Sequence, residues 1–275
     1  MSEPFAQYDG QLTAPPPEVL DAVLRIESQT FVQKVDWFSE IGSTNDHALS
    51  LAAQPTLETP RLIWADRQHA GRGRSGNAWW SAGGALTCSL VIERESWAPR
   101  WSLVSLVTGL AIADALAELL PGLQVQVKWP NDVFLEGRKV CGILIEPVPA
   151  SPERLVIGFG INVANSFATA PPELRATATA VCDHRPAAAL PAEVLLNVLQ
   201  HWERARERFC ANPAGIVNDW SQRCLLTARE VQLSAGTASV RGTCRGIDEE
   251  GQLLIETARG YERRIAGTVR IIPVA

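Results

Sequence analysis

The feature that most restricts the fold of this 275-residue chain is a change in the pattern of predicted secondary structure near Leu226. Before it, β segments alternate with longer helical segments, whereas five short β segments follow one another after it. Glycines fall between these short segments, at Gly236, Gly251, Gly260 and Gly267. Short β segments separated by glycines predict a small closed β-barrel appended to a larger α+β domain. We therefore expect a loose leader over residues 1–17, a main domain over 18–225 and a small β-barrel domain over 226–275.

Hydrophobic periodicity locates the elements within these domains. It predicts helices over residues 18–28, from 44 to about 52, and over 101–120, 191–209 and 214–220. It predicts strands in the main domain over residues 31–38, 62–65, 85–92, 125–129, 133–135, 139–146 and 155–163, the last interrupted by Gly158 and Gly160. The five C-terminal β segments are expected over residues 230–233, 239–246, 253–256, 261–265 and 268–272.

Composition excludes several classes of protein. The formal net charge of -5 argues against a nucleic-acid-binding surface over the whole molecule, because phosphate binding requires a basic face. No apolar stretch approaches the roughly 20 residues of a membrane span, and residues 1–10 lack the pattern of a signal peptide. The six cysteines are dispersed without a Cys-x-x-Cys pair, which is typical of a reduced intracellular protein. We expect a cytoplasmic protein with neither DNA nor membrane as a partner.

Two polar segments in the first half of the chain are candidates for a ligand site. Ser43-Thr44-Asn45 precedes a predicted helix, and taken alone it is as readily explained as a helix cap. Residues 68–79 read Gln-His-Ala-Gly-Arg-Gly-Arg-Ser-Gly-Asn-Ala-Trp, in which glycines allow the backbone to approach a ligand. Arg72 and Arg74 add forked donors for a carboxylate or phosphate. The closing Gly-Lys-Ser/Thr of a Walker A loop is absent, so this is a different kind of anion loop.

Two further segments follow in the second half of the main domain. Lys128-Trp129-Pro130-Asn131-Asp132-Val133 places an asparagine and an aspartate at a strand junction, where a carboxylate can hold magnesium, although a simple Asn-Asp turn is the alternative. Gly158-Phe159-Gly160-Ile161-Asn162 has two glycines spaced within a strand, which indicates close approach of another group to the backbone.

Together and in this order, the four segments resemble the biotin–protein ligase family. The match runs from Ser43 to Asn162, and the C-terminal portion is similar too. The resemblance implies an α+β fold like that of class II aminoacyl-tRNA synthetases and lipoate ligases, a mixed sheet with helices, followed by an SH3-like β-barrel. It implies ATP-dependent activation of biotin to biotinyl-5′-AMP, then transfer to a lysine of a biotin carboxyl carrier protein domain of a biotin-dependent carboxylase.

The resemblance also implies roles for individual residues, with Lys139, Arg72 and Arg74 as the catalytic cations. The residues expected to bind biotin are Ser43, Thr44, Asn45, Gln68, Gly71, Arg72, Gly73, Arg74, Lys139, Gly142 and Gly160. Those expected to bind ATP are Arg74, Trp79, Lys128, Asn131, Asp132 and Asn162. Asp132 is also expected to hold Mg²⁺, whereas no structural metal is expected.

The chemistry explains why cations are needed at such a site. The biotin carboxylate and the ATP α-phosphate are both anionic, so arginine, lysine and magnesium must offset their repulsion. Two departures from the family pattern stand out. Asn77 occupies a place where the loop usually carries an arginine, which bears on ATP affinity and retention of the intermediate. Phe159 is bulky for its place between two glycines and is expected to alter the pocket wall. No general base for the transfer step can be named.

Three other functions compete with this interpretation. A lipoate or octanoyl ligase is the nearest enzyme, but the arginine–glycine loop and Lys-Trp-Pro-Asn-Asp favour biotin. A catalytically inactive biotin-binding sensor is motivated by Asn77. A DNA-binding regulator is disfavoured, because the 42 residues before Ser43 leave little room for a winged helix-turn-helix. The sequence leaves the oligomeric state open, with a homodimer among the alternatives.

Overall fold

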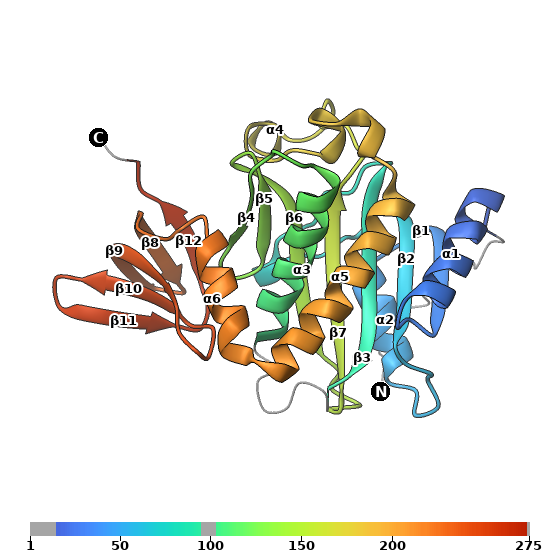
Figure 1. Cartoon of the computed structure of the whole chain (residues 1–275), viewed down its shortest axis with the longest axis horizontal. Coiled ribbons are helices and arrows are strands. Elements are labelled where there is room, and N and C mark those ends of the chain that lie inside the picture. The colour runs from blue at the N-terminus through green and yellow to red at the C-terminus, as the bar shows by residue number, and fades with distance from the viewer. Residues whose placement is uncertain (1–14, 95–102, 274–275) are drawn as a thin grey trace, which may run out of the picture. The chain divides into compact units, whose positions relative to one another are not determined.

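The computed structural model describes residues 15–94 and 103–273, which excludes most of the expected leader and the first residues of the helix expected over 101–120. The chain divides into two compact units, each made of two stretches of sequence (Figure 1). Unit 1 comprises residues 1–96 and 140–200, and unit 2 comprises residues 97–139 and 201–275. Among the described residues, no helix is both long and apolar enough to span a membrane.

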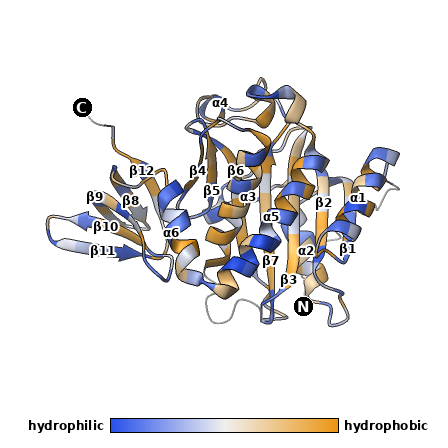
Figure 2. Ribbon diagram, in the orientation of Figure 1, coloured by the Kyte–Doolittle hydropathy of each residue, from blue (hydrophilic) through white to orange (hydrophobic). Residues whose placement is uncertain are grey.

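Unit 1 is built on a mixed β-sheet, as expected. Its strands are β1 (Lys34–Ile41), β2 (Arg61–Gln68), β3 (Ala85–Glu93), β6 (Arg138–Pro147, which begins in unit 2) and β7 (Arg154–Asn162). They lie in the order β1-β2-β3-β7-β6. β1 and β2 are parallel, and the remaining neighbours are antiparallel. The strands β3 and β7 are almost entirely buried, which explains their continuous apolar sequences (β3 is orange in Figure 2).

The helices that lie wholly in unit 1 are α1 (Pro17–Gln29), α2 (Thr44–Ala52) and the short α4 (Pro172–Thr177), which was not predicted. α2 packs on the sheet against β2, β3 and β7. Its Ala48 joins Phe38, Ile63 and Val91 in a fully buried cluster. Truncating Ile63 to alanine there should cost roughly 2–5 kcal/mol of stability, because a cavity adds to the lost transfer free energy. This packing fixes the start of α2 above the middle of the sheet.

Unit 2 contains α3 (Val104–Leu119), the antiparallel pair β4 (Val125–Lys128) and β5 (Asp132–Leu135), and α6 (Pro213–Arg223). α5 (Pro191–Ala211) begins in unit 1 and ends in unit 2. α3 is buried along most of its length and contacts β4, β5 and α6. The apolar surface around the whole helix explains this deep position.

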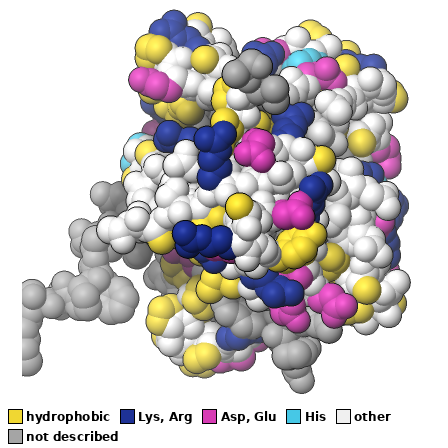
Figure 3. Space-filling model, turned by 90° about the vertical axis from the view of Figure 1, so that its left-hand side faces the viewer, with side chains coloured by type: hydrophobic (Ala, Val, Ile, Leu, Met, Phe, Trp, Pro, Cys, Tyr) yellow, Lys and Arg dark blue, Asp and Glu magenta, His cyan; other side chains and the backbone are white. Residues whose placement is uncertain are grey.

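The C-terminal part of unit 2 is an antiparallel sheet whose five strands confirm the five predicted β segments. They are β8 (Glu230–Ala235), β9 (Ala238–Ile247), β10 (Leu253–Thr257), β11 (Gly260–Arg264) and β12 (Thr268–Ile271), in the order β11-β10-β9-β8-β12. No pairing joins β11 to β12 among the described residues, so the sheet is open there and not a closed barrel. On the face shown in Figure 3, cationic and anionic side chains are interspersed.

Candidate functional site

The first predicted segment lies at the start of α2 and is held by a buried polar network in unit 1. Ser43 caps the helix, its hydroxyl accepting from the Asp46 amide at 3.3 Å. The Thr44 amide and hydroxyl both donate to Gln68 Oε1, at 2.7 and 3.1 Å. The helix-cap explanation is confirmed for Ser43, and the assignment of this segment to a ligand stays a prediction.

Asn45 is the most constrained side chain of this network. Its amide nitrogen donates to Glu146 Oε2 at 2.8 Å, and its Oδ1 lies 2.6 Å from the Ser89 hydroxyl. Ser89 Oγ is also 2.8 Å from Thr44 Oγ1. Thr44, Asn45 and Ser89 are each at most 5% exposed, so their hydrogen bonds are shielded from water.

Sequence reasoning missed Ser89 and Glu146, which complete this network. Ser89 could have been noticed as a hydroxyl within the apolar run of β3, since a buried hydroxyl needs a partner. Glu146 gave no such signal, because its partners Asn45 and Arg72 are 101 and 74 positions away in the sequence.

The two glycines of β7 allow side chains from other segments to touch the backbone. A Cβ added at Gly158 would lie 1.9 Å from Asn45 Oδ1, and one added at Gly160 would lie 2.3 Å from Trp79 Cε2. Both distances are below any real contact, so only glycine fits at either place. Gly160 is paired with Gly142 of β6, another residue expected at the biotin site. The predicted close approach is confirmed, and side chains of this chain make it.

Two expectations about β7 are wrong. The strand is not interrupted at its glycines, because β3 and β6 pair with it on both sides through Gly158 and Gly160. Phe159 does not form the same wall as these glycines, because alternate residues of a strand point to opposite faces. Its side chain is buried and, by this alternation, points to the face opposite the two glycines.

The arginine–glycine loop is folded back on itself. The Gly73 amide donates to the Asn77 carbonyl at 2.7 Å, and the Trp79 amide donates to the Gly71 carbonyl at 2.9 Å. The loop tip is a short 3₁₀ turn, Arg74–Gly76. A Cβ at Gly71 would lie 2.7 Å from the Trp79 carbonyl oxygen, which explains the need for glycine here.

Arg72 forms ion pairs with two carboxylates of unit 1. Its two terminal nitrogens donate to the two oxygens of Glu146, at 3.0 and 2.6 Å, and Nη2 also lies 2.7 Å from Asp46 Oδ1. Partial burial alone would lower the pKa of Arg72, but Glu146 and Asp46 outweigh it and raise that pKa. The guanidinium is therefore charged and oriented.

A second group of predicted residues lies in unit 2, where β4 meets β5. Lys128 ends β4 and is paired in register with Asp132, which begins β5. Lys139 Nζ lies 2.6 Å from Asp132 Oδ1. Burial lowers the pKa of Lys128, and the nearby cations Lys139 and Arg270 lower it further against the opposing charge of Asp132. This group concentrates positive charge around one carboxylate.

The predicted site residues therefore fall into two sets. Unit 1 holds Ser43, Thr44, Asn45, Gln68, Gly71, Arg72, Gly73, Arg74, Trp79, Gly142, Gly160 and Asn162. Unit 2 holds Lys128, Asn131, Asp132 and Lys139. Lys139 lies in β6 three residues before Gly142, so one strand carries members of both sets. Asn162 ends β7, where its Oδ1 accepts from Asn165 at 3.2 Å.

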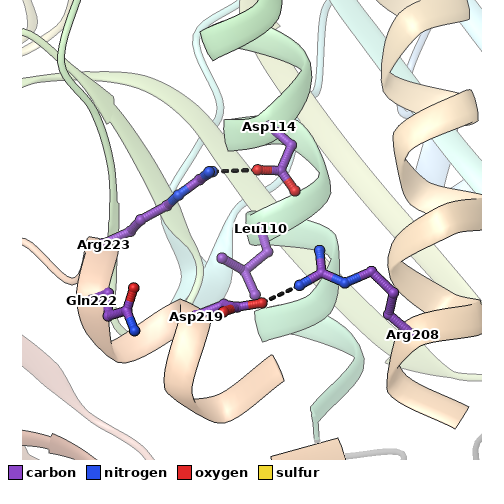
Figure 4. A pocket seen from close by; sticks show the side chains of 6 residues that line it. All are labelled: Leu110, Asp114, Arg208, Asp219, Gln222 and Arg223. Atoms are coloured by element: carbon purple, nitrogen blue, oxygen red, sulfur yellow. Dashed lines mark hydrogen bonds and ion pairs between the residues drawn. The ribbon is translucent and has the colours of Figure 1, made fainter. Parts of the chain in front are cut away.

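Unit 2 also contains a polar pocket that none of the predicted residues lines (Figure 4). Its volume is about 250 Å³, and its lining residues are Leu110, Asp114, Arg208, Asp219, Gln222 and Arg223. Arg223 is paired with Asp114 and Arg208 with Asp219. Because each cation is matched by a carboxylate, the pairs join α3, α5 and α6 and leave no excess charge for an ionic ligand.

Comparison with known families identifies both parts of the chain. Residues 37–162 match the Biotin/lipoate A/B protein ligase family, and residues 229–271 match the Biotin protein ligase C terminal domain. The two matches cover the arginine–glycine loop, Lys-Trp-Pro-Asn-Asp and the five-stranded sheet.

Individual relatives show the same similarity. A biotin–[acetyl-CoA-carboxylase] ligase of Paracoccus denitrificans is 32% identical over 227 residues, covering 80% of this chain and 93% of the relative. One of Mycobacterium tuberculosis is 31% identical over 237 residues, covering 82% and 84%. Among solved structures, the biotin protein ligase of Aquifex aeolicus in complex with biotin and ATP is similar, with a TM-score of 0.77 at 28% identity, covering 87% of this chain and 100% of that one.

Proposed function

This chain belongs to the biotin protein ligase family, and on that basis we propose that it attaches biotin to a carrier protein in two steps. Biotin and ATP first form biotinyl-5′-AMP and diphosphate. A lysine amine of the acceptor then attacks the acyl carbon, forming an amide and releasing AMP. The observation that carries this proposal is the division of the predicted residues into a buried hydrogen-bonding network and a cluster of cations.

The network of unit 1 has the properties needed to bind the uncharged ureido ring of biotin. A ureido group offers one carbonyl acceptor and two N–H donors, and it must be matched by fixed polar groups in an otherwise apolar site. The side chains of Ser43, Thr44 and Gln68 supply both donors and acceptors, and the surrounding hydrogen bonds fix their directions. We assign this network to biotin recognition.

The cation cluster of unit 2 has the properties needed for adenylation. The biotin carboxylate must approach the α-phosphate, and negative charge develops on the phosphate oxygens as diphosphate leaves. Lys139 is held by its ion pair with Asp132, and we assign it to both the carboxylate and the α-phosphate. Lys128 and Asn131 are assigned to the nucleotide phosphates.

In this proposal the arginine–glycine loop protects the intermediate. Biotinyl-5′-AMP is a mixed anhydride that water hydrolyses, so a covering loop would retain it until the acceptor lysine arrives. Arg72 forms ion pairs with Glu146 and Asp46, and a substrate carboxylate or phosphate could take the place of these two carboxylates. Arg74, at the loop tip, is assigned to the phosphates, whereas Trp79 and Asn162 are assigned to the adenosine part.

A magnesium ion fits the residues present only if ATP supplies most of its ligands. No group of three or more histidine, cysteine, aspartate or glutamate side chains among the described residues could hold a metal ion. Asp132 offers one carboxylate, whose Oδ1 is paired with Lys139 Nζ at 2.6 Å and whose Oδ2 remains for a cation. Magnesium is commonly held by one or two carboxylates together with phosphate oxygens. When bound there, Mg²⁺ would offset phosphate charge.

The names of the relatives support a carboxylase as the acceptor. Both relatives above are named for acetyl-CoA carboxylase, so we propose that a biotin carboxyl carrier domain supplies the lysine and that the reaction takes place in the cytoplasm. The match over residues 229–271 supports a domain boundary near Leu226.

A transfer assay tests the whole proposal. The purified protein is incubated with ATP, Mg²⁺, biotin and a carrier domain, and the mass of the carrier domain is measured. We expect a mass increase of one biotinyl group, absent when the acceptor lysine is replaced by arginine and absent with a lipoyl carrier domain. Labelling of the lipoyl domain with lipoate, and no labelling with biotin, would contradict the proposal.

A further inference from the structure

Trp129 lies inside the segment assigned to ATP, yet its polar atom contacts another part of unit 2. The side chain is only 2% exposed, and the residue begins the turn 129–131 that connects β4 to β5. Its indole N–H donates to the carbonyl of Gly251 at 3.0 Å. The two residues are 122 positions apart in the sequence. A buried indole N–H needs an acceptor, and the chain places one here from its C-terminal sheet.

The acceptor belongs to a turn whose shape is fixed by its own hydrogen bonds. Residues 248–252, which we name the 248–252 turn, connect β9 to β10. Asp248 Oδ1 accepts from the amides of Glu250 and Gln252, at 3.1 and 2.8 Å. The Gly251 amide donates to the Asp248 carbonyl at 3.0 Å. Gly251 has φ +78°, a conformation that favours glycine, so its carbonyl direction is set by the turn.

The start of α3 contacts both the 248–252 turn and the segment that contains Trp129. A Cβ at Gly251 would lie 2.4 Å from a methyl carbon of Leu103 and 2.8 Å from one of Leu106, so the turn packs directly on this end of the helix. The hydroxyl of Ser105 donates to the Pro130 carbonyl at 3.1 Å. Trp129 and Pro130 are therefore each held by a hydrogen bond from a different element.

We propose that the 248–252 turn positions the nucleotide-binding segment 128–132 through the hydrogen bond from Trp129 to Gly251. The inference rests on the proposed function, because the assignment of this segment to ATP does. Trp129 and the turn are positioning groups and touch no reacting atom. Ordinary core packing would bury the ring, but it would not require an acceptor whose direction is fixed by Asp248. Loosening the turn should therefore weaken the binding of ATP and leave the binding of biotin unchanged.

The test loosens the turn without altering the segment itself. Asp248→Ala removes the acceptor of two turn amides. The matched control is Thr257→Val in the β10–β11 turn of the same sheet, where Thr257 Oγ1 accepts from the Arg259 amide at 3.1 Å and donates to the Gly260 carbonyl at 3.0 Å. Trp129→Phe, which removes the N–H and keeps an aromatic ring, is the second variant.

Two readouts are compared in the full-length protein. Hydrogen–deuterium exchange of residues 131–135 should accelerate at least about fivefold in Asp248→Ala and in Trp129→Phe, and stay unchanged in Thr257→Val, because local protection follows local stability. The KM for ATP in biotin-dependent ATP–pyrophosphate exchange should rise about 5- to 20-fold in the first two variants, with the KM for biotin within about twofold.

The outcomes separate the positioning role from the proposed function. Unchanged exchange of residues 131–135 in both variants, or equal increases in the KM for ATP and for biotin, would overturn the inference. If Asp248→Ala lowers the folded fraction, Trp129→Phe decides alone. If the wild-type protein shows no biotin-dependent activity, the proposed function fails while hydrogen exchange still decides whether the turn holds the segment.

Discussion

The two groups of predicted site residues differ in how the protein holds them. In unit 1, Thr44, Asn45 and Ser89 are buried and joined to one another by hydrogen bonds between neutral groups, and Asn45 also donates to the Glu146 carboxylate. In unit 2, Lys128, Asp132 and Lys139 are partly exposed and joined by charge. Neutral buried networks are insensitive to salt and demand close geometry, whereas charge clusters tolerate small displacements and are screened by salt. We infer that shape selects biotin and that charge selects ATP.

The largest effect that this comparison predicts is at Gly158. Gly158→Ala would place a Cβ 1.9 Å from Oδ1 of Asn45, a side chain held by hydrogen bonds to Ser89 and Glu146. We expect biotin affinity to fall by more than about 100-fold, with ATP affinity changed far less. Isothermal titration with each ligand measures both.

Gly83→Ala is the matched control for that variant, because a Cβ at Gly83 has no neighbour within 4 Å. It should bind biotin as the wild type does. Equal affinity of Gly158→Ala and Gly83→Ala for biotin would mean that the buried network does not bind it.

Removing a charge in unit 2 should have the next largest effect. Lys139→Ala should slow adenylate formation by more than about tenfold, equivalent to about 1.4 kcal/mol of barrier. Lys34→Ala provides the control, because Lys34 is about half exposed, pairs only at 3.7 Å with Glu27 and lies outside both groups. Single-turnover formation of biotinyl-5′-AMP is the measurement, and an unchanged rate in Lys139→Ala would remove this residue from the mechanism.

A smaller effect is expected on the pH dependence of ATP binding. Burial lowers the pKa of Lys128, so the folded protein releases this proton at a lower pH than unfolded chain does. The KM for ATP should therefore rise as the pH increases through that lowered pKa, because the neutral amine attracts phosphate less. Lys128→Arg should flatten the profile, since a guanidinium stays charged.

The same lowered pKa predicts a small gain in stability as the pH rises through this window, because the unfolded state then binds more protons than the folded state. A rise in the KM for ATP that is identical in wild type and Lys128→Arg would show that another group titrates.

The smallest predicted effect concerns the loop that departs from its family pattern. Asn77→Arg should restore a cation beside the phosphates and lower the KM for ATP by about two- to fivefold at low salt, with the gain lost at high salt. Asn77→Gln keeps the site neutral and should leave the KM unchanged. A gain that persists at high salt would point to a packing effect and not to charge.

Local pattern predicted most of the fold, because each element carries its own periodicity. Ser43 before an amphipathic run predicted the cap of α2, and the glycines after Leu226 predicted the turns of the C-terminal sheet. The short α4 was missed because its six residues are too few to show a period.

Only those site residues that lie within the sequence motifs were predicted. The resemblance supplied Arg72, Asp132 and Lys139 as candidates, but their partners depend on which distant segments meet. Glu146 is 74 positions from Arg72 and 101 from Asn45, and no local signal marks it as their common acceptor. The contact of Trp129 with Gly251 was unpredictable for the same reason.

ATP–pyrophosphate exchange by the purified protein, run with biotin, with lipoate and with neither, decides whether this protein adenylates biotin. We expect exchange that requires biotin, because we assign recognition of the ureido ring to the network of unit 1. Exchange with lipoate and not with biotin would contradict it, as would tight binding of biotin without any exchange.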